Sequence, residues 1–190
     1  MNQGQVIVVM EQKLKGNKLK LKKMKSVHDV KLLMVDGIDD DLEIILENFD
    51  VNSFDRNGDN ILHHYILSSQ NNSSTLSPRK FIEELIKRGI DLNAIQSSAT
   101  NRSALHLAIG TKNQLVTELL INFKVDIDIL DKNGNTPLWL SVMNYRNDDP
   151  FFIKTLITNG ANKNIENNNG ISPIKLSNTI ANYDSKDLLS

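Results

Sequence analysis

The chain has 190 residues, of which 39% are hydrophobic and 24% charged, and its formal net charge is −1, as in one ordinary soluble domain. It contains no cysteine, which excludes disulfides, thiolate nucleophiles and cysteine-based zinc sites. No apolar run approaches the roughly 18 residues of a membrane-spanning helix. We therefore expect a soluble protein without a membrane span and, because nothing requires an oxidising compartment, a cytoplasmic location.

The first 25 residues form a basic segment. The run KLKGNKLKLKKMK supplies seven Lys against Glu11, so residues 1–25 carry a net charge of +6 and the remaining chain −7. Clustered Lys can neutralise phosphates, so one hypothesis is a flexible arm for nucleic acid, an anionic membrane or an acidic partner. We favour a solvated leader without a ligand, or a start at Met24, because aromatic residues and Arg are not interleaved. The apolar run QVIVVM is too short for a signal peptide and precedes the charges.

Residues 26–54 are predicted to form a capping unit. Its two helices are expected at about 27–35 and 39–48, with a turn at Asp36-Gly37 between them. Apolar residues at 42, 45, 46 and 49 recur at helical spacing, so the second helix should bury one face.

Four later segments share one pattern. They are NILH at 60–63, SALH at 103–106, TPLW at 136–139 and SPIK at 172–175, spaced by 43, 33 and 36 residues. Each follows a residue that tolerates positive φ, which is Gly58, Asn101, Gly134 or Gly170. In DKNGNTPLWLSV, an Asn-Gly turn is followed by Thr136, typical of a helix N-cap, and by proline at the first helical position. The pattern predicts a turn that leads directly into a helix.

A second pattern closes each unit. It reads FDVN at 49–52, GIDLN at 89–93, VDID at 125–128 and GANKN at 160–164. We divide the chain into a basic segment, 1–25, and a repeat domain, 26–190, with units at about 26–54, 55–97, 98–130, 131–166 and 167–190. The insertion SSQNNSSTLS separates the helices of the second unit, where Ser77-Pro78 should restart a helix. A shorter insertion, NDDP, precedes Phe151.

A period near 33 residues with a T-P-L-H-like helix start resembles the ankyrin repeat. The resemblance covers residues 26 to about 190 and implies an all-α ankyrin-repeat solenoid of stacked helix-turn-helix units with β-turn tips. It implies one buried ladder of Leu62, Leu105, Leu138 and Ile174, and a second of Leu85, Leu119 and Leu156 with Ile86 and Ile157. It also implies that His63 and His106 hydrogen-bond the backbone of the neighbouring turn. Trp139 and Lys175 replace this histidine in the last two units, which puts the histidine ladder in doubt there.

Catalysis and metal binding are not predicted. His63, His64 and His106 with Asp55 could suggest a metal site or a general base, but consecutive helical residues point about 100° apart, so structural histidines are the better interpretation. DRNGDN at 55–60 matches part of a calcium loop, but its Gly comes too early and the twelfth position has no Glu. Single glycines do not make a phosphate loop. We expect no enzyme activity, no metal, no cofactor and no small-molecule substrate.

The resemblance implies that another protein binds the concave face and the turn tips, and we expect the free chain to be a monomer. Ankyrin proteins make most contacts through hairpin tips and exposed positions of the first helix. The corresponding residues are Arg56, Asn57, Asp59, Arg102, Thr111, Lys132, Asn133, Asn135, Met143, Asn144, Tyr145 and Arg146. The cluster 143–146 is the most suggestive, because Met, Tyr and Arg are enriched in protein interfaces.

The C-terminal half is also similar to small bacterial ankyrin proteins with a GNTPLW…NYR…TIANYD pattern. Many of these are encoded beside polymorphic or contact-dependent toxins. This resemblance implies a cytosolic immunity protein that inhibits a toxin stoichiometrically, with the acidic part of the chain covering a basic active site. Two alternatives stay open. One is an effector or viral-type ankyrin protein that binds a host target, and the other is a nucleic-acid binder acting through residues 13–25.

Overall fold

The computed structural model describes residues 42–47, 49–68, 77–97, 100–146, 149–179 and 185–189. The hypotheses for the basic segment 1–25, for the first helix and turn of the capping unit and for most of the insertion at 68–77 lie outside the described residues. The division into units remains a proposal.

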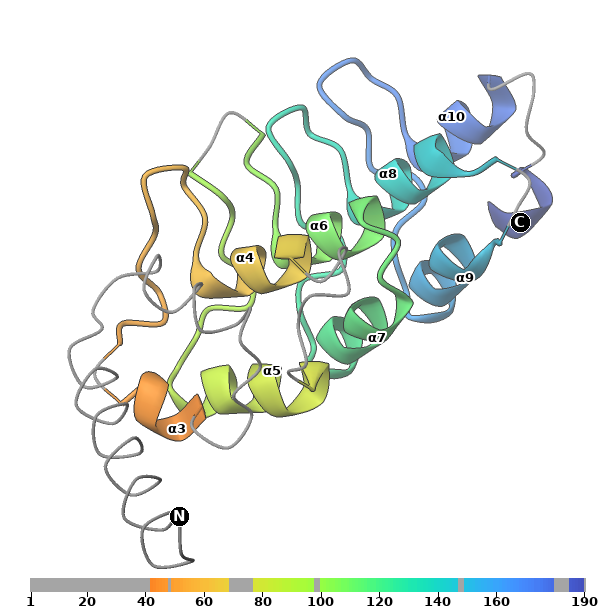
Figure 1. The fold of residues 1–190 in the computed structure, drawn as a ribbon. Helices are drawn as coiled ribbons and strands as arrows, with labels where there is room; N and C mark the ends of the chain where they lie inside the picture. Colours follow the sequence, from red (N-terminus) through yellow and green to blue (C-terminus); the bar gives the residue numbers. More distant parts are fainter. Residues whose placement is uncertain are drawn as a thin grey trace, which may run out of the picture.

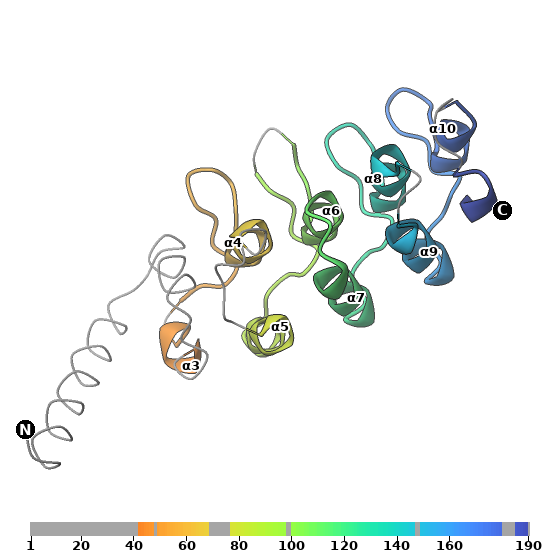
Figure 2. The ribbon, with the colours of Figure 1, turned by 45° about the vertical axis from the view of Figure 1, so that its right-hand side comes forward.

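The described elements are short helices joined by loops. They are α3 (Leu42–Ile45), α4 (Ile61–Ser68), α5 (Pro78–Lys87), α6 (Ala104–Gly110), α7 (Gln114–Asn122), α8 (Pro137–Asn144), α9 (Phe151–Thr158), α10 (Pro173–Thr179) and the 3-10 helix η3 (Asp187–Leu189). Figures 1 and 2 show two rows of helices. We call α4, α6, α8 and α10 the inner helices and α3, α5, α7 and α9 the outer helices. None of the described helices combines the length and apolar content needed to cross a membrane.

A loop projects ahead of each inner helix, and these loops line one edge of the stack (Figure 1). We call residues 54–60, 95–103, 130–136 and 166–172 the tip loops. Gly58, Gly134 and Gly170 have φ of 82°, 76° and 71°, and Asn101 takes the same role with φ of 47°. The prediction of positive φ at these four positions is confirmed. At Gly134, a Cβ would also lie 2.6 Å from the side-chain oxygen of Asn168 in the next tip loop, so only glycine fits.

Polar side chains start the inner helices where the sequence predicts. The Thr136 hydroxyl accepts a hydrogen bond from the Trp139 N–H at 3.1 Å, and α8 begins at Pro137. Ser103 caps α6 in the same way, by accepting from the His106 N–H. These bonds satisfy amide groups that a helix leaves free at its N-terminus, so each tip loop ends where its helix begins.

The core lies between the two rows. Leu62, Leu105 and Leu138 of the inner helices are buried, whereas Ile174 is only half-buried because no described inner helix follows α10. A half-buried Ile174 corrects the first ladder at its last position.

The outer row contributes a matching ladder. Leu85, Leu119 and Leu156 are buried in the outer helices. Ile86, expected to join them, is 37% exposed, because the next residue on a helix points about 100° away. Ile157 is half-buried.

The pattern that closes each unit becomes a series of hydrogen bonds between units. Asn52 Oδ1 accepts from the Asp91 N–H at 2.8 Å, and Asn93 Oδ1 accepts from the Asp126 N–H at 2.8 Å. Asp128 Oδ1 continues the series by accepting from the Asn162 N–H at 3.0 Å. We call residues 49–53, 89–94, 125–129 and 160–165 the closing loops. These hydrogen bonds fix the spacing of neighbouring units where each closing loop leads into the next tip loop.

Replacing Leu138 with alanine tests the inner ladder. Because its side chain is fully buried, Leu138→Ala should lower the free energy of unfolding by about 2–5 kcal/mol, measured by urea denaturation. Leu115→Ala on α7 is the matched control, since that leucine is 52% exposed, and its effect should stay within about 0.5 kcal/mol. Equal losses in the two variants would contradict the ladder.

Candidate interaction surface

One side-chain oxygen organises the first, the third and the fourth tip loop. Asp55 Oδ1 accepts the N–H groups of Asn57 and Asp59 at 2.8 and 3.1 Å. The carboxylate of Asp131 repeats this arrangement, with Oδ1 accepting from the N–H groups two and four residues later at 2.8 and 2.9 Å. In the last tip loop, Asn167 Oδ1 accepts two N–H groups in the same way, at 3.0 and 3.1 Å. These bonds hold the loops rigid before any partner is present.

Backbone hydrogen bonds join each tip loop to the next. The Ser97 N–H donates to the Gly58 carbonyl at 2.9 Å, and the Lys132 N–H donates to the Thr100 carbonyl at 3.1 Å. A third bond, from the Asn168 N–H to the Asn133 carbonyl, measures 2.9 Å. The tip loops therefore form one connected edge.

Two of the predicted binding residues belong to this framework. Asp59 is 7% exposed and its Oδ1 accepts from Gln96 Nε2 at 2.5 Å, while Asn135 is 8% exposed and accepts from Asn167 Nδ2 at 2.8 Å. The exposure expected at Asp59 and Asn135 is wrong, because each side chain turns inward to bind the following unit. Sequence reasoning gave Gln96 no part in this, since the second tip loop is two residues longer than the others.

The two predicted structural histidines bridge neighbouring units. His63 Nε2 lies 3.1 Å from the Ala94 carbonyl, and its Nδ1 accepts from the Asn60 N–H at 3.2 Å. His106 repeats this with the Asn135 carbonyl at 3.1 Å and the Ser103 N–H at 3.4 Å. A carbonyl can only accept and an N–H can only donate, so both rings are neutral with the proton on Nε2. Burial lowers the pKa of both histidines, although the carbonyl contacts oppose the shift.

The histidine bridge is absent where the sequence departs from it. Trp139 Nε1 is buried without a hydrogen-bond partner among the described residues. Lys175 turns back onto its own tip loop, pairing with Glu166 and donating to the Gly170 carbonyl at 3.1 Å.

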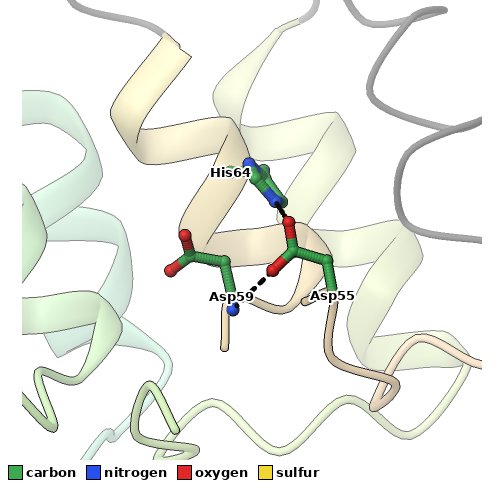
Figure 3. Close-up of side chains that lie close together, drawn as sticks. All are labelled: Asp55, Asp59 and His64. Atoms are coloured by element: carbon green, nitrogen blue, oxygen red, sulfur yellow. Dashed lines mark hydrogen bonds and ion pairs between the residues drawn. The ribbon is translucent and has the colours of Figure 1, made fainter. Parts of the chain in front are cut away.

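Among the described residues, one group of side chains has its potential metal-ligand atoms close enough together to hold an ion (Figure 3). It consists of Asp55 and Asp59 of the first tip loop and His64 of α4. His64 Nε2 lies 2.9 Å from Asp55 Oδ2. Burial by itself raises the pKa of Asp55, but hydrogen bonds from the Asp59 N–H, from His64 and from the Asn57 N–H outweigh it, so the pKa is lowered. Both oxygens of Asp55 already accept protein donors and Asp59 accepts from Gln96. These hydrogen bonds hold the first tip loop against α4.

The remaining predicted binding residues fall into two groups. Arg56, Asn57, Lys132 and Asn133 are exposed on the tip loops and Arg102 is half-buried there. The second group lies at the opposite, C-terminal ends of α6 and α8, about 10–12 Å away along helices of seven or eight residues. It contains Thr111, Met143, Asn144, Tyr145 and Arg146. The structure therefore separates what the sequence treats as one surface.

The helix-end group is partly structural. Tyr145 packs against the core, and Arg146 Nη1 donates to the carbonyls of Met143 at 2.7 Å and Tyr145 at 2.8 Å, which closes the C-terminus of α8. A pocket of about 120 Å³ lies beside them, lined by Ile109, Lys112, Gln114, Ser141, Asn144, Tyr145, Asp149, Phe152 and Ile153. Met143 is the exposed apolar residue of this group.

Sequence reasoning missed an apolar column on the tip loops. Phe54, Ile95 and Leu130 are 43%, 39% and 46% exposed, and each directly precedes the residue that starts a tip turn. The ring of Phe54 lies 6.3 Å from that of His63, over the first turn of α4. The equal position in three units was a usable signal, but the sequence analysis made no prediction for these residues.

The negative charge of the chain does not collect on this edge. Asp55, Asp59 and Asp131 are engaged within the tip loops, whereas exposed carboxylates such as Asp50, Asp91 and Asp126 lie in the closing loops. An acidic surface that could cover a basic active site is therefore not found on the first three tip loops, whose exposed charged groups are Arg56 and Lys132.

A model of three ankyrin repeats matches residues 73–167, which is half of the chain. The chain belongs to the ankyrin-repeat family. A solved structure, the ankyrin-repeat domain of Bcl-3, a member of the IκB family, superposes with a TM-score of 0.63 over 77% of this chain and 60% of that one, at 17% identity. This likeness and the helical architecture confirm the predicted ankyrin fold.

Two relatives match about half of this ankyrin-repeat chain. A putative ankyrin repeat protein of fowlpox virus is 33% identical over 94 residues, and an ADP-ribosylation factor GTPase-activating protein of Arabidopsis thaliana is 30% identical over 99 residues. The matched segments amount to 49% and 47% of this chain but only 27% and 12% of those proteins. Ankyrin repeats are protein-protein interaction modules, and the activity of a much longer relative is not carried over by such a segment.

The two bridging histidines predict loss of stability in mild acid. Their pKa values are lowered in the folded chain, so the unfolded chain binds more protons below its value of about 6.5. The contribution of His63 and His106 to the free energy of unfolding should be constant above about pH 6.5 and should fall as the pH drops toward 5. Urea denaturation across this range measures it. His106→Gln should show a shallower dependence, and an unchanged slope in that variant would contradict the assignment.

Asp55 should matter for stability although it lies in a loop. Asp55→Ala removes the acceptor for two N–H groups and for His64, so the free energy of unfolding should fall by about 1–3 kcal/mol. Asp50→Ala in a closing loop is a partial control, since its carboxylate accepts one N–H. If Asp55→Ala unfolded like the parent but lost a zinc-dependent rise in melting temperature, the group would be a metal site instead.

Proposed function

We propose that this chain is a non-catalytic inhibitor that binds one partner protein stoichiometrically through its tip loops and inner helices and covers that protein's working surface. The observation that carries the proposal is the exposed apolar column Phe54, Ile95 and Leu130 beside Arg56 and Lys132 on a hydrogen-bonded edge. Exposed apolar side chains with adjacent Arg are typical of protein-binding surfaces.

Rigidity supports binding through this edge. The tip loops are held by side-chain oxygens and joined by backbone bonds, so little conformational entropy should be lost when a partner docks. His63 and His106 are neutral and hydrogen-bonded on both ring nitrogens, which favours a structural role over general acid-base catalysis.

The partner's source is a separate part of the proposal. Similarity to a fowlpox virus ankyrin protein supports the host-directed alternative. The toxin-immunity hypothesis is supported by the resemblance of the C-terminal half alone, and the tip edge lacks the acidic character that would suit a basic nuclease. We therefore place a host-directed, cytoplasmic interaction first and immunity second. Nucleic-acid binding by residues 1–25 remains a hypothesis.

Capture experiments with matched variants test this function. The full chain is used as bait in lysates of candidate hosts, and bound proteins are quantified by mass spectrometry beside Phe54→Ala/Leu130→Ala. We expect a partner whose recovery falls by about tenfold in the tip variant, because apolar anchors supply much of the binding energy. Leu115→Ala should retain it, and Met143→Ala measures the contribution of the helix-end group.

Two results would contradict the proposal. Recovery of nucleic acid alone, lost at moderate salt, would move the function to the basic segment. Recovery of a protein that none of the tip or helix-end variants weakens would place binding outside both predicted groups.

A further inference from the structure

In each of the first three tip loops an exposed apolar side chain directly precedes the tip turn and a cation lies in the same loop. Phe54, Ile95 and Leu130 provide an exposed apolar side chain in each, and the equivalent position of the fourth tip loop is Glu166, which pairs with Lys175. Arg56, Arg102 and Lys132 provide one cation in each of the same three loops. In the fourth loop Glu166 is paired with Lys175, and the exposed apolar residue, Ile171, follows the turn instead of preceding it.

These three cations are unpaired among the described residues. The ion pairs there involve other side chains, and no described group accepts a hydrogen bond from the guanidinium of Arg56 or Arg102 or from the Lys132 ammonium. The nearby carboxylates do not neutralise them, because Asp55 and Asp131 accept the N–H groups of their own turns and Asp59 accepts from Gln96. The positive groups remain available to a ligand.

Of the three cations, Arg102 has the greatest need of a hydrogen-bond acceptor. Its residue is half-buried and its Nε is buried with no hydrogen-bond acceptor among the described residues. A buried donor without an acceptor is unfavourable, and the penalty is larger for a charged group. A carboxylate brought by a partner would relieve it through a charge-assisted hydrogen bond, for which guanidinium geometry is well suited.

The first three tip loops follow one another along the stack. The bonds from Ser97 to Gly58 and from Lys132 to Thr100 set the first three loops side by side, and both views of the ribbon show the same order along the stack (Figures 1 and 2). A chain segment that crosses the loops in this direction meets an apolar side chain and a cation at each of them.

Resting on the proposed function, we propose that the first three tip loops bind an acidic segment of the partner protein. Its Asp or Glu side chains pair with Arg56, Arg102 and Lys132, and its apolar side chains cover Phe54, Ile95 and Leu130.

A protein segment fits this edge better than a nucleic acid does. Sites for single-stranded nucleic acid combine an excess of positive charge with aromatic side chains on which bases stack. Here Phe54 is the one aromatic residue of the column, and Asp55 and Asp131 place a carboxylate beside the cations of two loops. Isolated carboxylates between apolar side chains match this alternation, whereas a continuous phosphate backbone does not.

Selection from a library of random displayed peptides on the full chain tests this chemistry. We expect enriched peptides to combine Asp or Glu with Leu, Ile, Val or Phe. An enriched peptide should bind Arg56→Glu/Lys132→Glu about tenfold more weakly, and its affinity should fall with added salt because exposed charges are screened. Lys80→Glu/Lys154→Glu is the matched control, since it reverses two exposed cations on the outer helices α5 and α9 and should leave the affinity unchanged.

Arg102 is tested separately because its substitution could affect folding. Arg102→Gln should weaken the same peptide while the melting temperature and the circular dichroism spectrum stay those of the parent. If Arg102→Gln changes the folding, the affinity of Arg56→Glu/Lys132→Glu for the peptide tests the inference by itself.

The outcomes separate this inference from the proposed function. Enrichment of basic or uncharged peptides that still require Phe54 and Leu130 would overturn the acidic partner but leave protein binding at the tips intact. Equal weakening by the tip and outer-helix variants, or absence of any enrichment, would overturn the inference, and the lysate capture then decides the proposed function. Tighter binding of single-stranded DNA than of every enriched peptide, lost in Arg56→Glu/Lys132→Glu, would replace the protein segment with nucleic acid.

Discussion

A helix pair of seven to ten residues per helix has an apolar face that only the next pair can cover, and this constraint governs the rest of the molecule. The buried leucines supply the attraction between pairs, but they do not set its direction or spacing. Hydrogen bonds do that at two edges. His63 reaches the Ala94 carbonyl at the end of the next closing loop and His106 reaches the Asn135 carbonyl in the next tip loop. Asn52, Asn93 and Asp128 accept from the backbone of the next closing loop.

The same polar groups decide which residues are available to a partner. The carboxylates of the tip loops are consumed in holding the turns, and the amides of Gln96 and Asn167 bind inward to the preceding unit. The exposed charged side chains of the first three tip loops, Arg56 and Lys132, are positive. The chain has an excess of acidic residues outside its basic segment, but exposed carboxylates such as Asp50, Asp91 and Asp126 lie in the closing loops and not on these tips.

The exposed apolar and charged residues of the tip loops connect the fold with protein binding. Family membership identifies an interaction module, and the chain is similar to a fowlpox virus ankyrin protein in sequence and to a domain of the IκB family in fold. Neither the family nor these similarities identify the partner protein. The apolar column and the unpaired cations of the first three tip loops indicate the chemistry of the partner, whereas the fourth tip loop has Glu166, paired with Lys175, at the position of the column.

The sequence by itself determined the fold. Turn residues with positive φ, helix caps and apolar spacing are local signals, so Gly58, Asn101, Thr136 and Pro137 could be placed from their own neighbours along the chain. Exposure is not local. Asp59 and Asn135 look like loop residues but are buried by side chains more than thirty positions away, and Phe54, Ile95 and Leu130 look like core residues but remain exposed. Only the stacking of units decided these cases, because burial depends on which neighbour covers a side chain and not on the side chain alone.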